Sequence, residues 1–104
     1  MKSAESPSER FPDVGLKVQE RPGHGIFFEF NPGSAKISEI YNRVIEEVLS
    51  KVGSPTPHGP MAEGRGYQPG YQSWQIEAID IQMAQDLIPT INTLAQKLFE
   101  EGPK

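Results

Sequence analysis

Every apolar segment of this 104-residue chain is patterned to bury one side only. Three short segments, residues 14–18, 26–30 and 74–78, alternate along the chain with a period of two, which is typical of strands with one buried face. Two longer segments, residues 37–52 and 84–98, repeat apolar side chains every three or four residues, which is typical of helices with one buried stripe. Elements of this kind need one partner layer each, so the pattern predicts two layers around one core.

A segment rich in glycine and proline separates these elements. Residues 53–72 contain five glycines and four prolines in twenty positions, which is typical of a loop. The predicted order is therefore strand, strand, helix, long loop, strand, helix. We expect an α+β two-layer sandwich, in which a small, mostly antiparallel sheet has both helices on one face.

Composition also indicates where the domain begins and ends. Residues 1–12 are rich in Ser, Glu and Pro, with too few apolar side chains to offset the entropy lost on ordering, so they are predicted to form a flexible tail. Phe11 is the residue of that tail suited to docking on the domain. Residues 13–101 are predicted to form a single α+β domain that contains the loop, and residues 102–104 a C-terminal tail.

Local signals indicate how the first elements are joined. Pro22-Gly23 suits the centre of a type II turn, because proline fixes φ near −65° and glycine tolerates a positive φ. Ser34 is a candidate N-cap for the first helix, and Gly53 is a candidate left-handed stop after it. We expect a right-handed crossover through this helix to lead to the third strand.

Pro89 leaves two alternatives for the last helix. Inside a helix, proline removes a hydrogen bond and costs about 3 kcal/mol. Either one helix runs from residue 81 to 100 and bends near Pro89, or the helix begins after an N-cap at Asp86. In the second case residues 80–85 form a separate turn, with Asp80 as its cap.

Charge and cysteine content exclude several classes of function. The formal net charge is −4, from 10 Lys and Arg against 14 Asp and Glu, which argues against general nucleic-acid binding. The chain has no cysteine, which excludes a disulfide framework, a cysteine zinc site and thiol catalysis. The apolar runs are too short to span a membrane, and the first residues do not form a secretory signal. We therefore expect a cytoplasmic protein with no membrane partner.

Histidine is the natural acid–base residue near neutral pH, and the chain has two, His24 and His58. Both lie beside glycine in turn-like sequences, which is typical of exposed turn histidines. Neither belongs to a His-x-x-x-His or His-Glu-x-x-His motif, so no metal or other cofactor is expected. The alternative is a polar site that His24, His58 and Glu63 form in space, under a lid made by the 53–72 loop.

A second set of candidate residues lies in and beside the loop. Arg65, Tyr67, Tyr71 and Trp74 fall within ten residues, and these residue types dominate protein interfaces. Trp74 also fits the core face of its strand. The two tyrosines suit either packing the loop onto the domain or contacting a partner.

Phe27 is the large apolar exception on an otherwise polar face of the predicted sheet. Either the N-terminal tail covers it, for example through Phe11, or it forms part of a contact surface. If that contact is with a second copy, the protein is a homo-oligomeric structural protein.

These observations favour a non-catalytic protein-binding module. No catalytic motif is present, the loop is enriched in interface residue types, and the acidic balance suits a basic protein partner. Small, acidic, cysteine-free inhibitors such as immunity proteins, which bind a toxin or enzyme, have this general composition. The alternatives are a small enzyme or ligand-binding domain with the loop as a lid, and the homo-oligomer.

Overall fold

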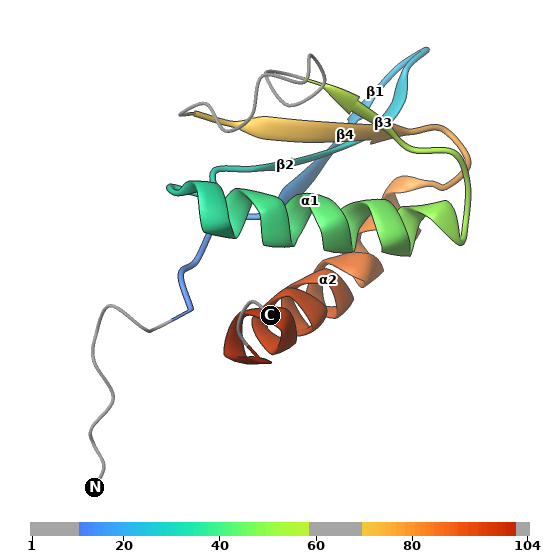
Figure 1. The fold of residues 1–104 in the computed structure, drawn as a ribbon. Helices are drawn as coiled ribbons and strands as arrows, with labels where there is room; N and C mark the ends of the chain where they lie inside the picture. Colours follow the sequence, from blue (N-terminus) through green and yellow to red (C-terminus); the bar gives the residue numbers. More distant parts are fainter. Residues whose placement is uncertain (1–10, 59–69, 102–104) are drawn as a thin grey trace, which may run out of the picture.

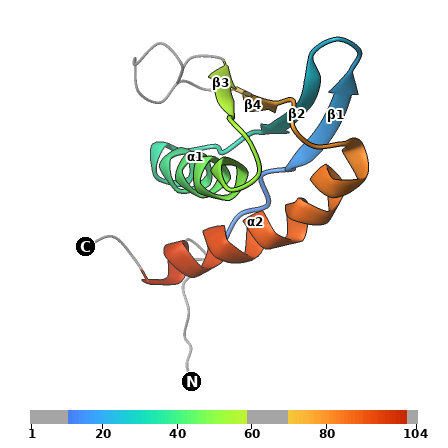
Figure 2. The ribbon, with the colours of Figure 1, turned by 90° about the vertical axis from the view of Figure 1, so that its right-hand side faces the viewer.

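A computed structural model describes residues 11–58 and 70–101, which form an antiparallel four-stranded sheet and two helices (Figure 1). The elements follow in the order β1 (Lys17–Arg21), β2 (Gly25–Phe30), α1 (Ala35–Ser50), β3 (Thr56–His58), β4 (Gln72–Ile76) and α2 (Ile81–Glu101). The strands lie side by side in the order β1-β2-β4-β3. Both helices lie on one face of the sheet (Figures 1 and 2), which confirms the predicted α+β fold.

The strand β3 lies inside the segment that the sequence predicted to be a loop. It pairs antiparallel with β4 at the edge of the sheet, with Pro57 opposite Trp74. Proline has no backbone N–H for a central ladder, so an edge position accommodates it. Because β3 and β4 reverse the chain, β4 runs antiparallel to β2, and the predicted crossover directly into the third strand is wrong. The helix α1 leads instead to β3, which runs parallel to β2 with β4 between them.

The first hairpin has the predicted turn but a later start. The His24 N–H donates to the Arg21 carbonyl oxygen at 2.9 Å, and Gly23 has φ +82°, as a type II turn requires. The strand β1 begins at Lys17, after Gly15 with φ +66° interrupts the alternation that begins at Val14. Val14 nevertheless lies in the core.

The two ends of α1 have different explanations. Ser34 is the N-cap, as predicted, and its Oγ accepts a hydrogen bond from the Ile37 N–H at 3.3 Å. Gly53 does not have a positive φ, so its predicted role as a left-handed stop is wrong. A Cβ at this position would lie 2.8 Å from Ala78 Cβ and 2.9 Å from Ile76 Cδ1. Glycine is therefore required here because the chain passes close to the end of β4.

The helix α2 is continuous through Pro89, so the alternative start at Asp86 is wrong. Asp80 caps it: its Oδ1 accepts from the Met83 N–H at 2.9 Å. Pro89 is exposed, while Ile91 just beyond it is fully buried, so packing beyond the proline offsets the lost hydrogen bond. Within the described parts of the chain, no helix is long and apolar enough to cross a membrane.

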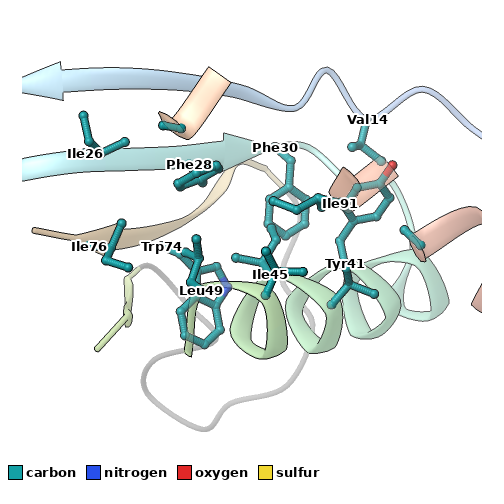
Figure 3. Packing of buried hydrophobic residues seen from close by; sticks show 14 of the residues in the cluster. Val14, Ile26, Phe28, Phe30, Tyr41, Ile45, Leu49, Trp74, Ile76 and Ile91 are labelled. Atoms are coloured by element: carbon teal, nitrogen blue, oxygen red, sulfur yellow. The ribbon is translucent and has the colours of Figure 1, made fainter. Parts of the chain in front are cut away.

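The core fills the space between the sheet and the two helices (Figure 3). Phe11 extends it, because its ring stacks on Tyr41 at 5.9 Å and contacts Phe99 at 5.4 Å between ring centroids. Phe11, which the sequence placed at the end of the flexible tail, therefore docks on the helix layer, as suggested for this residue. The largest fully buried apolar side chains come from β2, α1, β4 and α2: Ile26, Phe28, Phe30, Tyr41, Ile45, Leu49, Ile76 and Ile91.

Candidate functional site

The sheet has a second face, turned away from the helices, on which no described element packs (Figures 1 and 2). Strand register places Gln19, Phe27, Gln75 and Thr56 in one row across it. We call this surface the open face. It is defined by the side chains that alternate onto it from all four strands, together with Tyr71, which directly precedes β4 and contacts Lys17: Lys17, Gln19, Arg21, Phe27, Glu29, Thr56, His58, Tyr71, Ser73 and Gln75.

Phe27 lies at the centre of the open face and is half-buried there. The Arg21 guanidinium carbon lies 4.8 Å from its ring centroid, and the His58 ring lies 5.6 Å away. Phe11 does not cover it, since Phe11 packs on Tyr41 in the helix layer. Among the described residues, Phe27 is therefore shielded only in part, by its polar neighbours.

Glu29 holds Arg21 in this position. Arg21 Nη2 lies 3.6 Å from Glu29 Oε2, and Gln19 Nε2 donates to Glu29 Oε1 at 3.0 Å. Half of the Arg21 side chain is exposed, so the ion pair itself contributes at most about 1 kcal/mol to stability. Its main effect is geometric, because it restricts the guanidinium to the space above the Phe27 ring.

Gln75 contacts both histidines, the backbone of His24 and the ring of His58. Its Nε2 donates to the His24 carbonyl oxygen at 2.6 Å, and its Oε1 lies 2.7 Å from His58 Nε2. Because Oε1 can only accept, His58 Nε2 must carry the hydrogen. The His24 ring is exposed, and Glu63 lies outside the described residues. The structure thus describes two of the three residues of the predicted polar site, and of these only His58 has a described side-chain contact.

The sequence did not single out Gln75. Alternation along the strand after the loop places it on the polar face, but its contacts depend on β3 and on the first hairpin. Ser73 lies opposite His58 in the register of β3 and β4, yet the hydrogen bond described for the His58 ring is to Gln75. The described residues therefore contain no hydrogen-bonded nucleophile and base. They also contain no group of three His, Cys, Asp or Glu side chains that could hold a metal ion.

The interface candidates near the loop lie in different environments. Tyr71 is 61% exposed, and Lys17 Nζ lies 5.3 Å from its ring centroid. Trp74 is only 6% exposed and packs in the core (Figure 3), where its Nε1 donates to Asn42 Oδ1 at 2.7 Å. It is therefore not available to a partner. Arg65 and Tyr67 lie outside the described residues.

A buried polar cluster lies behind Tyr71, between α1 and β4. Gln72 is 2% exposed, and its Oε1 accepts from Ser38 Oγ at 2.8 Å and from Asn42 Nδ2 at 2.9 Å. Two donors at Oε1 establish which way the amide points; its Nε2 has no partner among the described residues. The two hydrogen bonds at Oε1 link the start of β4 to α1.

The open face can offer hydrogen-bonding amides, two cations and two aromatic rings to a binding partner. It presents Lys17 and Tyr71 at one place and Arg21 above Phe27 at another. In comparisons with known proteins, no family model, no curated protein and no solved structure matches this chain.

Proposed function

We propose that this protein is a non-catalytic protein-binding module whose contact surface is the open face. The observation that carries the proposal is the uncovered sheet face with Tyr71 exposed beside Lys17 and Phe27 half-buried beside Arg21. Tyrosine, phenylalanine and arginine are enriched in the centres of protein interfaces.

The side chains of this surface are already ordered in the free protein. Arg21 is held by Glu29 and Phe27, and His58 is held by Gln75. Ordering a flexible side chain at an interface costs about 0.5–1.5 kcal/mol, so a surface ordered in advance loses less free energy on binding. The backbone beneath these side chains is held by sheet pairing, which further reduces the free energy lost on binding.

Charge constrains the partner on two length scales. The whole chain carries −4, which favours long-range attraction to a basic protein. The open face itself carries two cations, Lys17 and Arg21, and one anion, Glu29. Its direct contacts therefore suit an acidic or aromatic group on a partner that is basic overall. An immunity-type inhibitor of a toxin or enzyme is the narrower form of this proposal.

The test uses the full-length protein as bait in extracts of its own host, with Tyr71→Ala and Arg21→Ala as surface variants. Arg43→Ala is the control, because Arg43 is exposed on α1 in the other layer. We expect one protein to be captured by the wild type and the control and to bind each surface variant at least about 30-fold more weakly, as for an interface hot spot. Absence of any such protein, or equal binding by all three variants, contradicts the proposal.

The alternative of a small-molecule site is supported by an open hollow of about 570 Å³ beside Gln75, at the end of β4 that is away from Tyr71. Its polar lining includes Thr56, Gln75 and Glu77. NMR spectra of the two histidine rings distinguish the cases. A metabolite mixture that shifts the His58 signals and leaves His24 unchanged favours a ligand site, and unchanged spectra favour the binding module.

A further inference from the structure

The strand β1 forms one edge of the sheet, and β3 forms the other (Figure 2). Within residues 11–58 and 70–101, β1 pairs only with β2, and β3 pairs only with β4. The outer side of an edge strand leaves backbone N–H and C=O groups unpaired, and these groups are a template for a further strand. Each edge is therefore a candidate docking site if its outward groups are able to pair.

The alternation of the backbone identifies the outward groups of β1. The His24 N–H donates to the Arg21 carbonyl oxygen at 2.9 Å, so the backbone carbonyl of Arg21 points into the hairpin. In an antiparallel ladder, successive residues direct their N–H and C=O groups alternately to the two sides of the strand. The residues of β1 that point outward are therefore Val18 and Glu20, and each offers one donor and one acceptor.

The edge at β3 offers less. Carried across the registers of β2 and β4, the same alternation turns the backbone groups of Thr56 and His58 inward and those of Pro57 outward. Proline has no N–H, so the outward residue of this three-residue strand has no donor. A short strand with an outward proline is a common protection of a sheet edge. The strand β1 is five residues long and has no proline, so it is the edge that can accept a strand.

The side chains along β1 set the charge of this edge. Lys17, Gln19 and Arg21 are all exposed and alternate onto the open face. The two cations are four residues apart, which is about 13 Å along a strand. The open face supplies one anion against them, Glu29, which lies opposite Lys17 and has its Oε2 3.6 Å from Arg21 Nη2. One positive charge remains in excess, so this edge attracts a strand with negative charge on the same side.

The same charges make a second copy of the chain a poor occupant. When two β1 strands pair antiparallel over all five residues, Gln19 lies opposite itself and Lys17 lies opposite Arg21 twice. Like charges directly opposite each other destabilise a pair of strands. The edge is therefore suited to a segment of a different sequence.

We propose that β1 accepts an extended segment of the protein partner as a fifth strand, with acidic side chains opposite Lys17 and Arg21. Main-chain hydrogen bonds to Val18 and Glu20 hold the segment, and its two acidic side chains, four residues apart, select it. Val18 packs on the core side of β1, so an apolar side chain of the segment lies opposite it. This inference rests on the proposed function, because the open face continues from this edge and provides the rest of the contact area.

A synthetic peptide tests the edge directly. In antiparallel pairing, acetyl-Thr-Glu-Thr-Thr-Val-Glu-Thr-amide places its glutamates opposite Arg21 and Lys17 and its valine opposite Val18. The peptide is titrated into the isotope-labelled full-length protein and followed by NMR. Ordering a free peptide costs affinity, so we expect a dissociation constant of about 1 mM. The amide signals of Val18 and Glu20 should shift and exchange more slowly with solvent.

The control peptide has lysine in place of both glutamates. It should bind at least about 10-fold more weakly, because two attractive cross-strand pairs become two repulsive ones. Equal binding of the two peptides, no binding of the acidic one, or shifts that leave Val18 and Glu20 unchanged would each overturn the proposal.

Glu20→Pro and Glu20→Ala form the matched pair that tests the backbone. Both remove the same exposed carboxylate, but only proline removes the outward N–H, which the hairpin does not use. We expect Glu20→Pro to bind the acidic peptide about 5-fold more weakly than Glu20→Ala, as for the loss of one hydrogen bond. Equal affinities contradict pairing at this edge.

If Glu20→Pro does not fold, the peptide carries the change instead. N-methylation of its valine blocks an N–H that faces β1, and N-methylation of the threonine just before the valine blocks one that points away. The first modification should abolish binding and the second should not. The opposite order, or equal effects, overturns the proposed pairing.

The edge and the open face can fail separately. Glu20→Pro leaves every side chain of the open face in place, whereas Tyr71→Ala leaves the backbone of β1 in place. A captured partner that Tyr71→Ala weakens and Glu20→Pro does not would retain the proposed function and exclude the edge. Peptide binding at β1 with no captured partner would retain the edge as a strand-binding site and exclude the proposed function.

Discussion

Phe27 and Phe28 are neighbours in β2 and have the same side chain, yet they lie in opposite environments. Phe28 is fully buried between the sheet and the helices, whereas Phe27 is half-buried between Arg21 and His58. The glutamines of β4 repeat the contrast. Gln72 is bonded inside the core, and Gln75 is bonded on the open face. Residue type alone therefore does not define a role; the side of the sheet does.

The largest expected difference is between alanine substitutions at the two phenylalanines. Phe28→Ala removes a fully packed ring and should lower the free energy of unfolding by about 3–5 kcal/mol. Phe27→Ala removes a ring that water already reaches, and should cost about 1 kcal/mol or less. Urea denaturation followed by circular dichroism measures both.

If Phe28→Ala does not fold, Phe28→Leu and Phe27→Leu are compared instead, and the order should be the same. Equal losses at the two positions would mean that the open face is as well packed as the core, and would contradict its description as an accessible surface.

The glutamine pair is expected to show the same contrast on a smaller scale. Gln72→Ala leaves the Ser38 hydroxyl without its acceptor, whereas Asn42 Nδ2 keeps the Ser38 carbonyl oxygen at 2.7 Å. A buried unsatisfied group costs about 1–3 kcal/mol. Gln75→Ala should cost less than about 1 kcal/mol, because water can replace the amide there. The measurement is again the free energy of unfolding in urea. A larger loss at Gln75 would show that the His24 and His58 contacts hold the sheet together.

Arg21→Ala should have a still smaller effect on stability. It removes an exposed ion pair with Glu29 and a cation–π contact with Phe27, which together are worth about 1 kcal/mol or less. Arg43→Ala is the control with no such contacts in the described structure. Thermal unfolding should separate the two variants by a few degrees at most, and the difference should shrink in high salt.

The last contrast appears only above pH 10 and involves the two tyrosines on the opposite layers. Burial, and then the negative charge of Asp13, raises the pKa of Tyr41 to about 12 from its ordinary value near 10. The folded state therefore holds the proton more tightly than the unfolded state. This contribution to stability is complete below pH 10 and is lost as the pH rises from 10 through 12.

Melting temperatures of the wild type and Tyr41→Phe between pH 8 and about pH 11 test this. The wild type should lose stability more steeply above pH 10 than the variant, which has no phenol at this position. Tyr71→Phe, which changes the exposed tyrosine, serves as control and should follow the wild type. Parallel curves for Tyr41→Phe and the wild type would contradict the assignment.

Local chemistry made several parts of this protein predictable. Ser34 caps a helix whatever surrounds it, and Pro22-Gly23 makes a type II turn from its own dihedral preferences. Alternation in β2 and β4 likewise assigns Phe27 and Gln75 to one face and Phe28 and Trp74 to the other. The members of the open face were therefore accessible to prediction.

Other features could not be predicted, because they depend on segments that are distant in the chain. The sequence predicts a helix stop at Gly53, and its lack of a Cβ is explained only by the placement of Ala78 and Ile76 against it. The strand β3 exists because β4 offers it an edge, since its Thr-Pro-His sequence alone has no strand pattern. The pairing of His58 with Gln75 follows from that edge.

Taken by itself, the sequence determined which residues form the two layers and which side of each strand and helix is buried, because the periods of two and 3.6 are properties of the backbone. Only the tertiary structure decided that β4 lies between β2 and β3 and that α2 continues through Pro89. Those outcomes depend on how elements distant in the chain pack together, and the free energy of that packing is not encoded in any single segment.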